Sequence, residues 1–361
     1  MRRWMYVLIA LLLAAASCGL FENKKEAEPP PGRRDYTWTV DTLANEPGGF
    51  IYDIWGSSPS NVWAGSPTGV QVLWHFDGTR WSPWPHAQQI SPGFDITCLY
   101  GFARDDVWGG SDNGELYHFN GEIWSVAFTY SIPGMEQPDF TDIWGTSPTD
   151  IYVVGRAEPD TATSGASMRS FLLHYNGRSW KQLIVTNFGV QFQRVRVQQG
   201  VVFILGTQNA LGTYLIYNYV KGHLVQLISK TSDEVYTVSM NDVVNEIYFD
   251  VGNMLETYNV NEFDRNQKGP FLPIMALPDS ETVVGVSGRN KNDLFIYTFG
   301  GVLQYNGINT KYLLRIPEDM PDSPFREMLF KNQVFFTVWD VKYGVTNVIV
   351  HGVLSDTTKT E

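Results

Sequence analysis

The stretch DIWGSSPSNVWAG, from Asp53 to Gly65, returns in nearly the same form as DIWGTSPTDIYVVG, from Asp142 to Gly155. A third copy lies between them and is built on Leu99-Tyr100-Gly101, so the central aromatic residues follow one another at intervals of 45 and 44 residues. Self-similarity at a fixed period of this length is the signature of a repeat protein. The chain is therefore a tandem array of one structural unit.

A second landmark follows each copy, the motif H-F/Y-D/N-G-x-x-W at residues 75–81, 118–124 and 174–180. Asp-Gly and Asn-Gly pairs favour tight hairpins because both residues tolerate positive φ. The segments around them are short and rich in β-branched and aromatic residues, which favours strands. Each copy therefore divides into four antiparallel strands, called a to d in chain order, which is the pattern of one blade of a β-propeller.

Four more copies are recognisable in a less regular form. Residues 283–307 keep every landmark and end in Tyr-Asn-Gly, whereas residues 195–219, 236–260 and 326–354 keep only the strand pattern. The expected number of blades is therefore seven.

The two ends of the array complement each other. The last copy ends soon after its third strand, at residues 347–354, and lacks a fourth. Trp38 stands 43 residues before Trp81, which places it in the register of a fourth strand. We expect the N-terminal strand to complete the last blade and close the ring, which leaves no open sheet edge.

The tandem motifs I-W-G, S/T-P-x-D/N-V-W and H-Y/F-D/N-G-x-x-W resemble the β-propeller repeats of secreted and lipid-anchored bacterial proteins, with the general form of Kelch and WD40 propellers. The likeness is strong over about residues 36–182 and fair over about residues 282–312. It implies an all-β, seven-bladed propeller of four-stranded antiparallel blades over residues 36–356, followed by a tail at 357–361. Propellers host many functions, so the resemblance implies a fold and no particular reaction.

The N-terminus has the pattern of an export signal. Arg2 and Arg3 precede an apolar run at residues 7–13, and small residues follow at 14–17. A short apolar run of this kind is typical of a signal peptide and is too short for a permanent membrane span. Residues 1–17 are therefore predicted to be a signal peptide.

The residue after this signal is a cysteine. The string LLAAASC, which ends at Cys18, resembles the lipobox of bacterial lipoproteins, although Ala15 stands where that motif prefers leucine. The resemblance implies lipidation of Cys18 and a protein anchored in the bacterial envelope, at the outer membrane, on a side that the motif does not specify. Residues 18–35 are polar and Pro-rich, as expected of a flexible tether. An ordinary secretory signal is the alternative.

Charge and cysteine content argue against a nucleic-acid partner and against a reactive thiol. The net charge is −12, which disfavours binding to nucleic acid because phosphate backbones are negative. The only cysteine besides Cys18 is Cys98, which lies in the apolar string ITCLYG and is expected to be a buried, inert thiol.

Three histidines and two aspartates recur in the repeat. His75, His118 and His174 occupy equivalent positions in different copies, so they are expected to serve the structure of their own blades rather than to share a metal. Asp53 and Asp142 begin the innermost strand and could line the central channel, where a structural role is favoured over a functional one. No cofactor is expected.

The sequence contains no recognised catalytic motif, such as H-E-x-x-H, G-x-S-x-G or a glycine-rich phosphate loop. A catalytic role is therefore not the first expectation, and no catalytic residue is predicted.

The loops indicate where a partner would bind. Strand alternation places the b–c and d–a loops on one face, and these loops hold most of the extra length, above all the insertion at residues 156–170. Variable loops on a rigid scaffold are where binding usually resides. The candidate contacts on this loop face are Trp84, His86, Tyr130, Phe140, Arg156, Glu158, Asp160 and Arg169.

The sequence therefore favours an envelope binding or scaffold module with a protein or glycan partner at the loop face. The alternative is a propeller enzyme, a hydrolase or lyase, that acts on extracellular glycans through acidic loop residues. A loop face with no partner also stays open.

Overall fold

The computed structural model describes residues 29–43, 50–67, 72–85, 90–160, 168–186, 189–208, 212–233, 238–243, 246–252, 254–258, 271–277, 283–315, 326–340 and 346–355. The chain divides into two compact units, residues 1–30 and 31–361, and every described strand belongs to the second. None of the described residues is helical, so these ranges contain no helix able to cross a membrane.

The described residues form 28 strands, which are arranged in four-stranded antiparallel meanders called blades below. The first three are β2 (Asp53–Ser58), β3 (Asn61–Gly65), β4 (Leu73–Phe76), β5 (Trp81–Pro83); β6 (Cys98–Ala103), β7 (Asp106–Gly110), β8 (Glu115–Phe119), β9 (Trp124–Thr129); and β10 (Asp139–Ser147), β11 (Asp150–Ala157), β12 (Arg169–Tyr175), β13 (Trp180–Val185). The next two are β14 (Gln191–Gln198), β15 (Val201–Gln208), β16 (Thr213–Val220), β17 (His223–Thr231); and β18 (Val238–Val243), β19 (Glu246–Val251), β20 (Met254–Tyr258), β21 (Phe271–Ala276). The remaining strands are β22 (Val283–Asn290), β23 (Asp293–Thr298), β24 (Gly301–Tyr305), β25 (Thr310–Arg315); and β26 (Glu327–Leu329), β27 (Gln333–Asp340), β28 (Thr346–Leu354), with β1 (Tyr36–Thr42).

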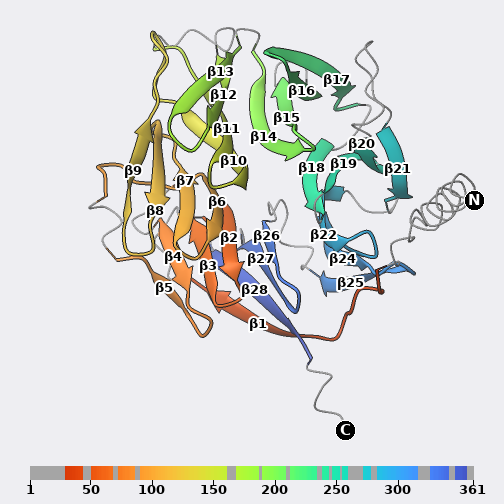
Figure 1. The fold of residues 1–361 in the computed structure, drawn as a ribbon. Helices are drawn as coiled ribbons and strands as arrows, with labels where there is room; N and C mark the ends of the chain where they lie inside the picture. Colours follow the sequence, from red (N-terminus) through yellow and green to blue (C-terminus); the bar gives the residue numbers. More distant parts are fainter. Residues whose placement is uncertain are drawn as a thin grey trace, which may run out of the picture. The chain divides into compact units, whose positions relative to one another are not determined.

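Strands pair in chain order within each blade except the last, whose fourth strand is β1. The blades β18–β21 and β22–β25 form one eight-stranded sheet, because Val243 and Gly288 pair in parallel between β18 and β22. In Figure 1 the first strand of each blade lies nearest the common centre. This all-β arrangement is that of a β-propeller.

The N-terminal strand pairs with the last strand of the chain. β1 runs antiparallel to β28, from Tyr36 opposite Leu354 to Thr42 opposite Val348. The Trp38 ring covers Gly352, where a Cβ atom would come within 2.5 Å of it. The sheet order β1-β28-β27-β26 therefore has the N-terminal strand in the fourth position, as the register of Trp38 predicts.

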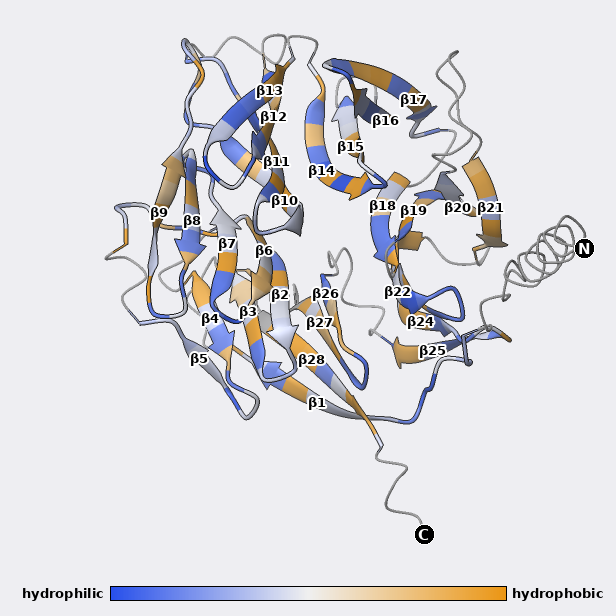
Figure 2. Ribbon diagram, viewed as in Figure 1, coloured by the Kyte–Doolittle hydropathy of each residue, from blue (hydrophilic) through white to orange (hydrophobic). Residues whose placement is uncertain are grey.

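The core lies between blades. The described residues form seven hydrophobic clusters, each of which joins one blade to the next, and the cluster that contains Phe76 and Phe335 joins the first blade to the last. Single strands carry both hydrophobic and hydrophilic segments in Figure 2, as expected when only part of each strand packs against a neighbouring blade. Close packing in a closed cycle makes the ring a rigid scaffold.

The predicted hairpins form at the Asp-Gly and Asn-Gly pairs. Gly78 and Gly121 have φ values of 99° and 96°, which residues with a side chain adopt only with strain. The repeat motif therefore marks the c–d turns correctly.

Candidate functional site on the central axis

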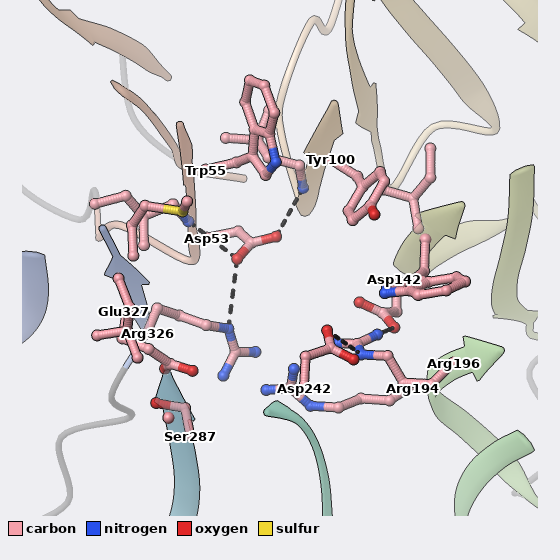
Figure 3. Close-up of a pocket in the computed structure, with 17 residues that line it drawn as sticks. Asp53, Trp55, Tyr100, Asp142, Arg194, Arg196, Asp242, Ser287, Arg326 and Glu327 are labelled. Carbon is pink, nitrogen blue, oxygen red and sulfur yellow. Dashed lines mark hydrogen bonds and ion pairs between the residues drawn. The ribbon is translucent and has the colours of Figure 1, made fainter. Parts of the chain in front are cut away.

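The first strands of the blades enclose a cavity of about 330 Å³ (Figure 3). Its size is at the small end of the range for ligand pockets, which is about 300–1,000 Å³. Aromatic side chains from three successive blades line it, namely Trp55, Tyr100 and Trp144. The charged lining residues are Asp53, Asp142, Arg194, Arg196, Asp242, Arg326 and Glu327. This axial cavity is the candidate functional site.

Two aspartates of the cavity connect neighbouring blades. The Oδ2 atom of Asp53 accepts a hydrogen bond of 2.7 Å from the backbone N–H of Leu99, and Oδ2 of Asp142 accepts one of 2.8 Å from Val195. In each case the donor lies on the first strand of the next blade. Both interpretations of these aspartates are therefore correct: they line the channel and they have a structural role.

Arg196 is held between two carboxylates. Its Nη1 atom lies 2.6 Å from Oδ2 of Asp142, and its Nε atom lies 2.9 Å from Oδ2 of Asp242. Burial alone would lower the pKa of Arg196, but the two carboxylates outweigh burial and raise it. Burial raises the pKa of Asp242, and the nearby Arg196 opposes that shift. The charge of Arg196 is thus compensated within the protein.

Arg194 and Arg326 are bound much less tightly. The Nε atom of Arg326 is 3.7 Å from Oδ1 of Asp53, beyond hydrogen-bond distance. Arg194 makes no side-chain hydrogen bond or ion pair with any residue of the described ranges. Burial and the nearby guanidinium groups of Arg326 and Arg196 lower the pKa of Arg194. Figure 3 shows both side chains directed toward the middle of the cavity.

Glu327 is a carboxylate that interacts electrostatically with both Arg194 and Arg326. Burial raises its pKa to about 7, although Arg194 and Arg326 oppose the shift; Asp53 raises the pKa further, and a hydrogen bond with Ser287 lowers it. Glu327 is therefore partly protonated near neutral pH. Burial also raises the pKa of Asp53, against the effect of Arg326.

The cavity is thus polar, carries both signs of charge and has aromatic walls. Such a lining can hold a compact polar group through charge-assisted hydrogen bonds. No three His, Cys, Asp or Glu side chains of the described residues are arranged to hold a metal ion.

Two of the predicted loop-face contacts lie in the core, and a third packs against it. Phe140 is fully buried, and only 8% of Tyr130 is exposed, with its hydroxyl donating to Oε1 of Gln182. Trp84 is half-buried, with its ring centroid 4.9 Å from that of Trp63. Tyr130 and Phe140 are therefore wrong as surface contacts, since packing between blades uses both rings, and Trp84 serves the core as well.

The charged candidates lie at the facing ends of β11 and β12 and in the b–c loop between these strands, and their contact with a partner stays a prediction. Met135 of a d–a loop pairs with Pro159 of the insertion, which places these two loops side by side. Glu158 and Asp160 are exposed. Arg156 donates to Asp139 at 3.2 Å and to Gln191 at 2.7 Å, and Arg169 is half-buried. His86 and Cys18 lie outside the described residues.

Each repeat histidine is bound within its own blade. The Nε2 atoms of His118 and His174 lie 2.8 and 2.7 Å from Asp106 and Asp150, the residues that begin the preceding strands. His75 pairs with Asn61 in the same way, at 2.7 Å. The predicted structural role is therefore observed.

Cys98 is 1% exposed and burial raises its thiol pKa, as expected of an inert cysteine.

The sequence prediction missed the arginines, Asp242 and Glu327. Arg194 pairs with Leu205 as Asp142 pairs with Val154, so it occupies the position of that aspartate in the next blade. The sequence offered one signal for Arg194: it is a charged residue in the otherwise apolar first strand of an irregular copy.

Comparisons with known proteins identify the fold. No protein-family model and no curated protein matches the chain. Among solved structures, YCF48 bound to D1 peptide is 16% identical over 91% of this chain and 100% of that chain, with a TM-score of 0.57. The extracellular domain of BT3049 from B. thetaiotaomicron is 14% identical over 87% of this chain and 42% of that one, with a TM-score of 0.53. The WD40 repeats of RRP9 are 9% identical over 90% of this chain and 99% of that one, with a TM-score of 0.56. These likenesses support a propeller-like repeat fold and no family.

Proposed function

We propose that this protein is a seven-bladed β-propeller, lipid-anchored through Cys18 in the bacterial envelope, that binds a protein partner at its axial cavity and the adjoining loop face. The observation that carries the proposal is the axial cavity, where Arg194 has no partner among the described residues. A cation held in a rigid cavity without a protein partner is arranged for a ligand rather than for stability.

The loops give the cavity a wider contact surface. Asp53 is the first residue of β2, and Arg326 immediately precedes β26, so these charges lie near the ends of the first strands that the d–a loops enter. The d–a loops share their face with the b–c loops, because strands alternate in direction. A partner that reaches into the cavity would therefore approach the face that carries the described residues of the insertion, 156–160 and 168–170.

The solved structures support a partner that is a protein. One neighbour is described as bound to a peptide, and another as a set of WD40 repeats. The anchor and the envelope location rest on the N-terminal sequence alone.

The test is affinity purification from detergent-solubilised membranes after crosslinking, with three baits: the wild-type chain, Arg194→Glu combined with Arg326→Glu, and Arg178→Glu. Arg178 is exposed at a c–d turn, on the opposite face, and serves as a matched control. We expect one specific protein with the wild-type and Arg178→Glu baits and at least a tenfold loss with the double variant. Equal recovery by all three baits would exclude the cavity as the binding site.

Hydrolysis of glycans is a second candidate function, favoured by the pKa of Glu327 of about 7, which suits a general acid. Glycosidases need a second carboxylate free to act. Asp53 accepts hydrogen bonds from the backbone N–H groups of Ile54 and Leu99. Asp142 is bound by the N–H of Val195 and by Arg196, and these contacts rank this function below binding. If the wild-type chain hydrolyses a chromogenic glycoside and Glu327→Gln abolishes this activity, hydrolysis would rank above binding.

The loop carboxylates give this alternative little support. Burial and the neighbouring carboxyl group of Asp112 raise the pKa of Asp95 to about 8, but only 6% of Asp95 is exposed. A glycan cannot reach a carboxyl group that is covered to this extent.

A further inference from the structure

We propose that the axial cavity recognises a single carboxylate group, held between the guanidinium groups of Arg194 and Arg326, and that this carboxylate is the C-terminus of the partner's chain. This inference rests on the proposed function, because it names the chemical group that the cavity would take.

The supply of hydrogen-bond donors points to these two arginines. A guanidinium group has five N–H donors in a planar fork. Arg196 uses its Nη1 atom on Asp142 and on its neighbouring carbonyl, and its Nε atom faces Asp242. The Nε atom of Arg326 lies 3.7 Å from Asp53, and its guanidinium carbon lies 5.7 Å from the centroid of the Tyr52 ring, so neither contact is a hydrogen bond. Arg194 has no hydrogen-bond partner in the described part of the chain. The guanidinium groups of Arg194 and Arg326 therefore keep free N–H donors that can bind a ligand in the cavity.

The charges of the lining favour a ligand of low charge. Three arginines and four acids line the cavity, so the lining is close to neutral when Glu327 is protonated. Asp142 and Asp242 pair with Arg196, and Asp53 lies closest to Arg326, which leaves Arg194 without an ion-paired carboxylate. A single carboxylate could pair with Arg194 and Arg326, whereas a phosphate dianion would meet stronger repulsion from the surrounding acids.

The size and walls of the cavity indicate the end of a chain. About 330 Å³ is small for a ligand site, so a compact group can enter and a folded surface cannot. Trp55, Tyr100 and Trp144 supply apolar walls for the residue that bears the carboxylate. Bidentate pairing of an arginine with a carboxylate is among the strongest polar contacts available in such a site.

The test uses a pool of N-acetylated tripeptides with all residues at each position, prepared once with a free C-terminus and once as the C-terminal amide. The immobilised, detergent-solubilised full chain selects from each pool, and mass spectrometry measures recovery. We expect at least tenfold more acid than amide from the wild-type chain and from Arg178→Gln. Arg194→Gln and Arg326→Gln should abolish the difference. Equal recovery of the two pools, or none of either, overturns the proposal.

Two further arms identify the chemistry and the source of the anion. Benzoate should compete for the site, whereas benzamide should not; stronger competition by inorganic phosphate than by benzoate contradicts a carboxylate site. Binding of benzoate without acid peptides would overturn the assignment to a chain terminus. Arg194→Lys keeps the charge and loses the fork, so it should reduce acid recovery even if Arg194→Gln fails to fold.

The pH dependence gives an independent check. Arg194, Arg326, Asp53 and Ser287 act on Glu327 from the strands around it, and ionised Glu327 would repel the ligand and occupy the arginines. Recovery of acid peptides should therefore fall from pH 6 to pH 8 for the wild-type chain and stay level for Glu327→Gln. A level wild-type profile argues against placement of the ligand beside Glu327.

The two proposals fail in different ways. If neither peptide pool binds but capture of the protein partner still depends on Arg194 and Arg326, the carboxylate inference is wrong and the proposed function stands. If capture does not depend on these arginines, the proposed site itself is wrong.

Discussion

At the scale of single residues, the histidines of strand c show how the repeat supports itself. Each one packs against an aromatic ring of strand b and pairs with the first residue of that strand; the ring centroids of His118 and Trp108 lie 4.4 Å apart. His351 repeats the arrangement with Phe335 at 4.0 Å and with Gln333, in a copy whose sequence had lost the motif. The contact is therefore a property of the blade rather than of the motif.

His75 offers a test of this contact, because its partner Asn61 is neutral. Burial lowers the pKa of His75, so the unfolded chain takes up the proton more readily and stability is lost as pH falls through the ordinary histidine pKa. Asn61→Asp places a carboxylate 2.7 Å from Nε2, and we expect the His75 pKa to rise by about one to two units. Proton NMR titration of the histidine C2–H signals measures the shift. An unchanged pKa would contradict the pairing.

Glu327 has the opposite dependence on pH. Because folding raises its pKa to about 7, its contribution to stability is complete below the pKa of the unfolded chain and is lost as pH rises through about 7. The free energy of unfolding of the wild type, relative to Glu327→Gln, should therefore fall by up to about 3 kcal/mol between pH 4.5 and pH 8. Urea unfolding at several pH values measures it, and a difference that does not change with pH would disprove the buried placement of Glu327.

At the scale of elements, the first strands form the site and β1 completes a sheet. Thr37 of β1 lies opposite Val353 of β28, and both side chains are exposed. Directly opposed residues on antiparallel strands are close enough for a disulfide.

This pairing predicts that Thr37→Cys with Val353→Cys will form a disulfide that joins the two ends of the ring. Because the bond closes a very long loop, it should stabilise the fold by about 3–5 kcal/mol and raise Tm relative to the reduced form. Calorimetry with and without reductant measures the gain, and Thr37→Cys alone is the control. Failure of the pair to crosslink in the folded protein would contradict the closure.

The sequence predicts the positions of the strands better than it predicts the residues of the site. The register of Trp38, Asp53 and Asp142 follows from intact copies, so the blades and the channel position of both aspartates could be derived by counting residues. Arg194 and Glu327 belong to copies without landmarks, where the register is undefined without the backbone pairing. Tyr130 was misassigned because a residue just after β9 turns into the core, which composition alone does not reveal. Phe140 was misassigned because β10 begins at Asp139, before Asp142, the residue expected to begin that strand.

At the scale of the whole molecule, the anchor proposed at Cys18 would determine where the protein meets its partner. If Cys18 is lipidated, Cys18→Ser should move the protein from the membrane fraction to the soluble fraction, because a tether without acyl chains has no membrane affinity. Fractionation together with labelling by a fatty-acid analogue checks this outcome. Membrane retention or continued labelling of the variant would rule out Cys18 as the anchor.

The claim that unites these scales is that a rigid ring of blades presents an axial cavity to a protein partner. The most direct measurement is the Kd of the purified partner for the wild-type chain, for Arg194→Gln combined with Arg326→Gln, and for Arg178→Gln. We expect a Kd at least tenfold weaker for the double variant, and a Kd for Arg178→Gln equal to that of the wild type. An unchanged Kd for a correctly folded double variant would contradict this claim.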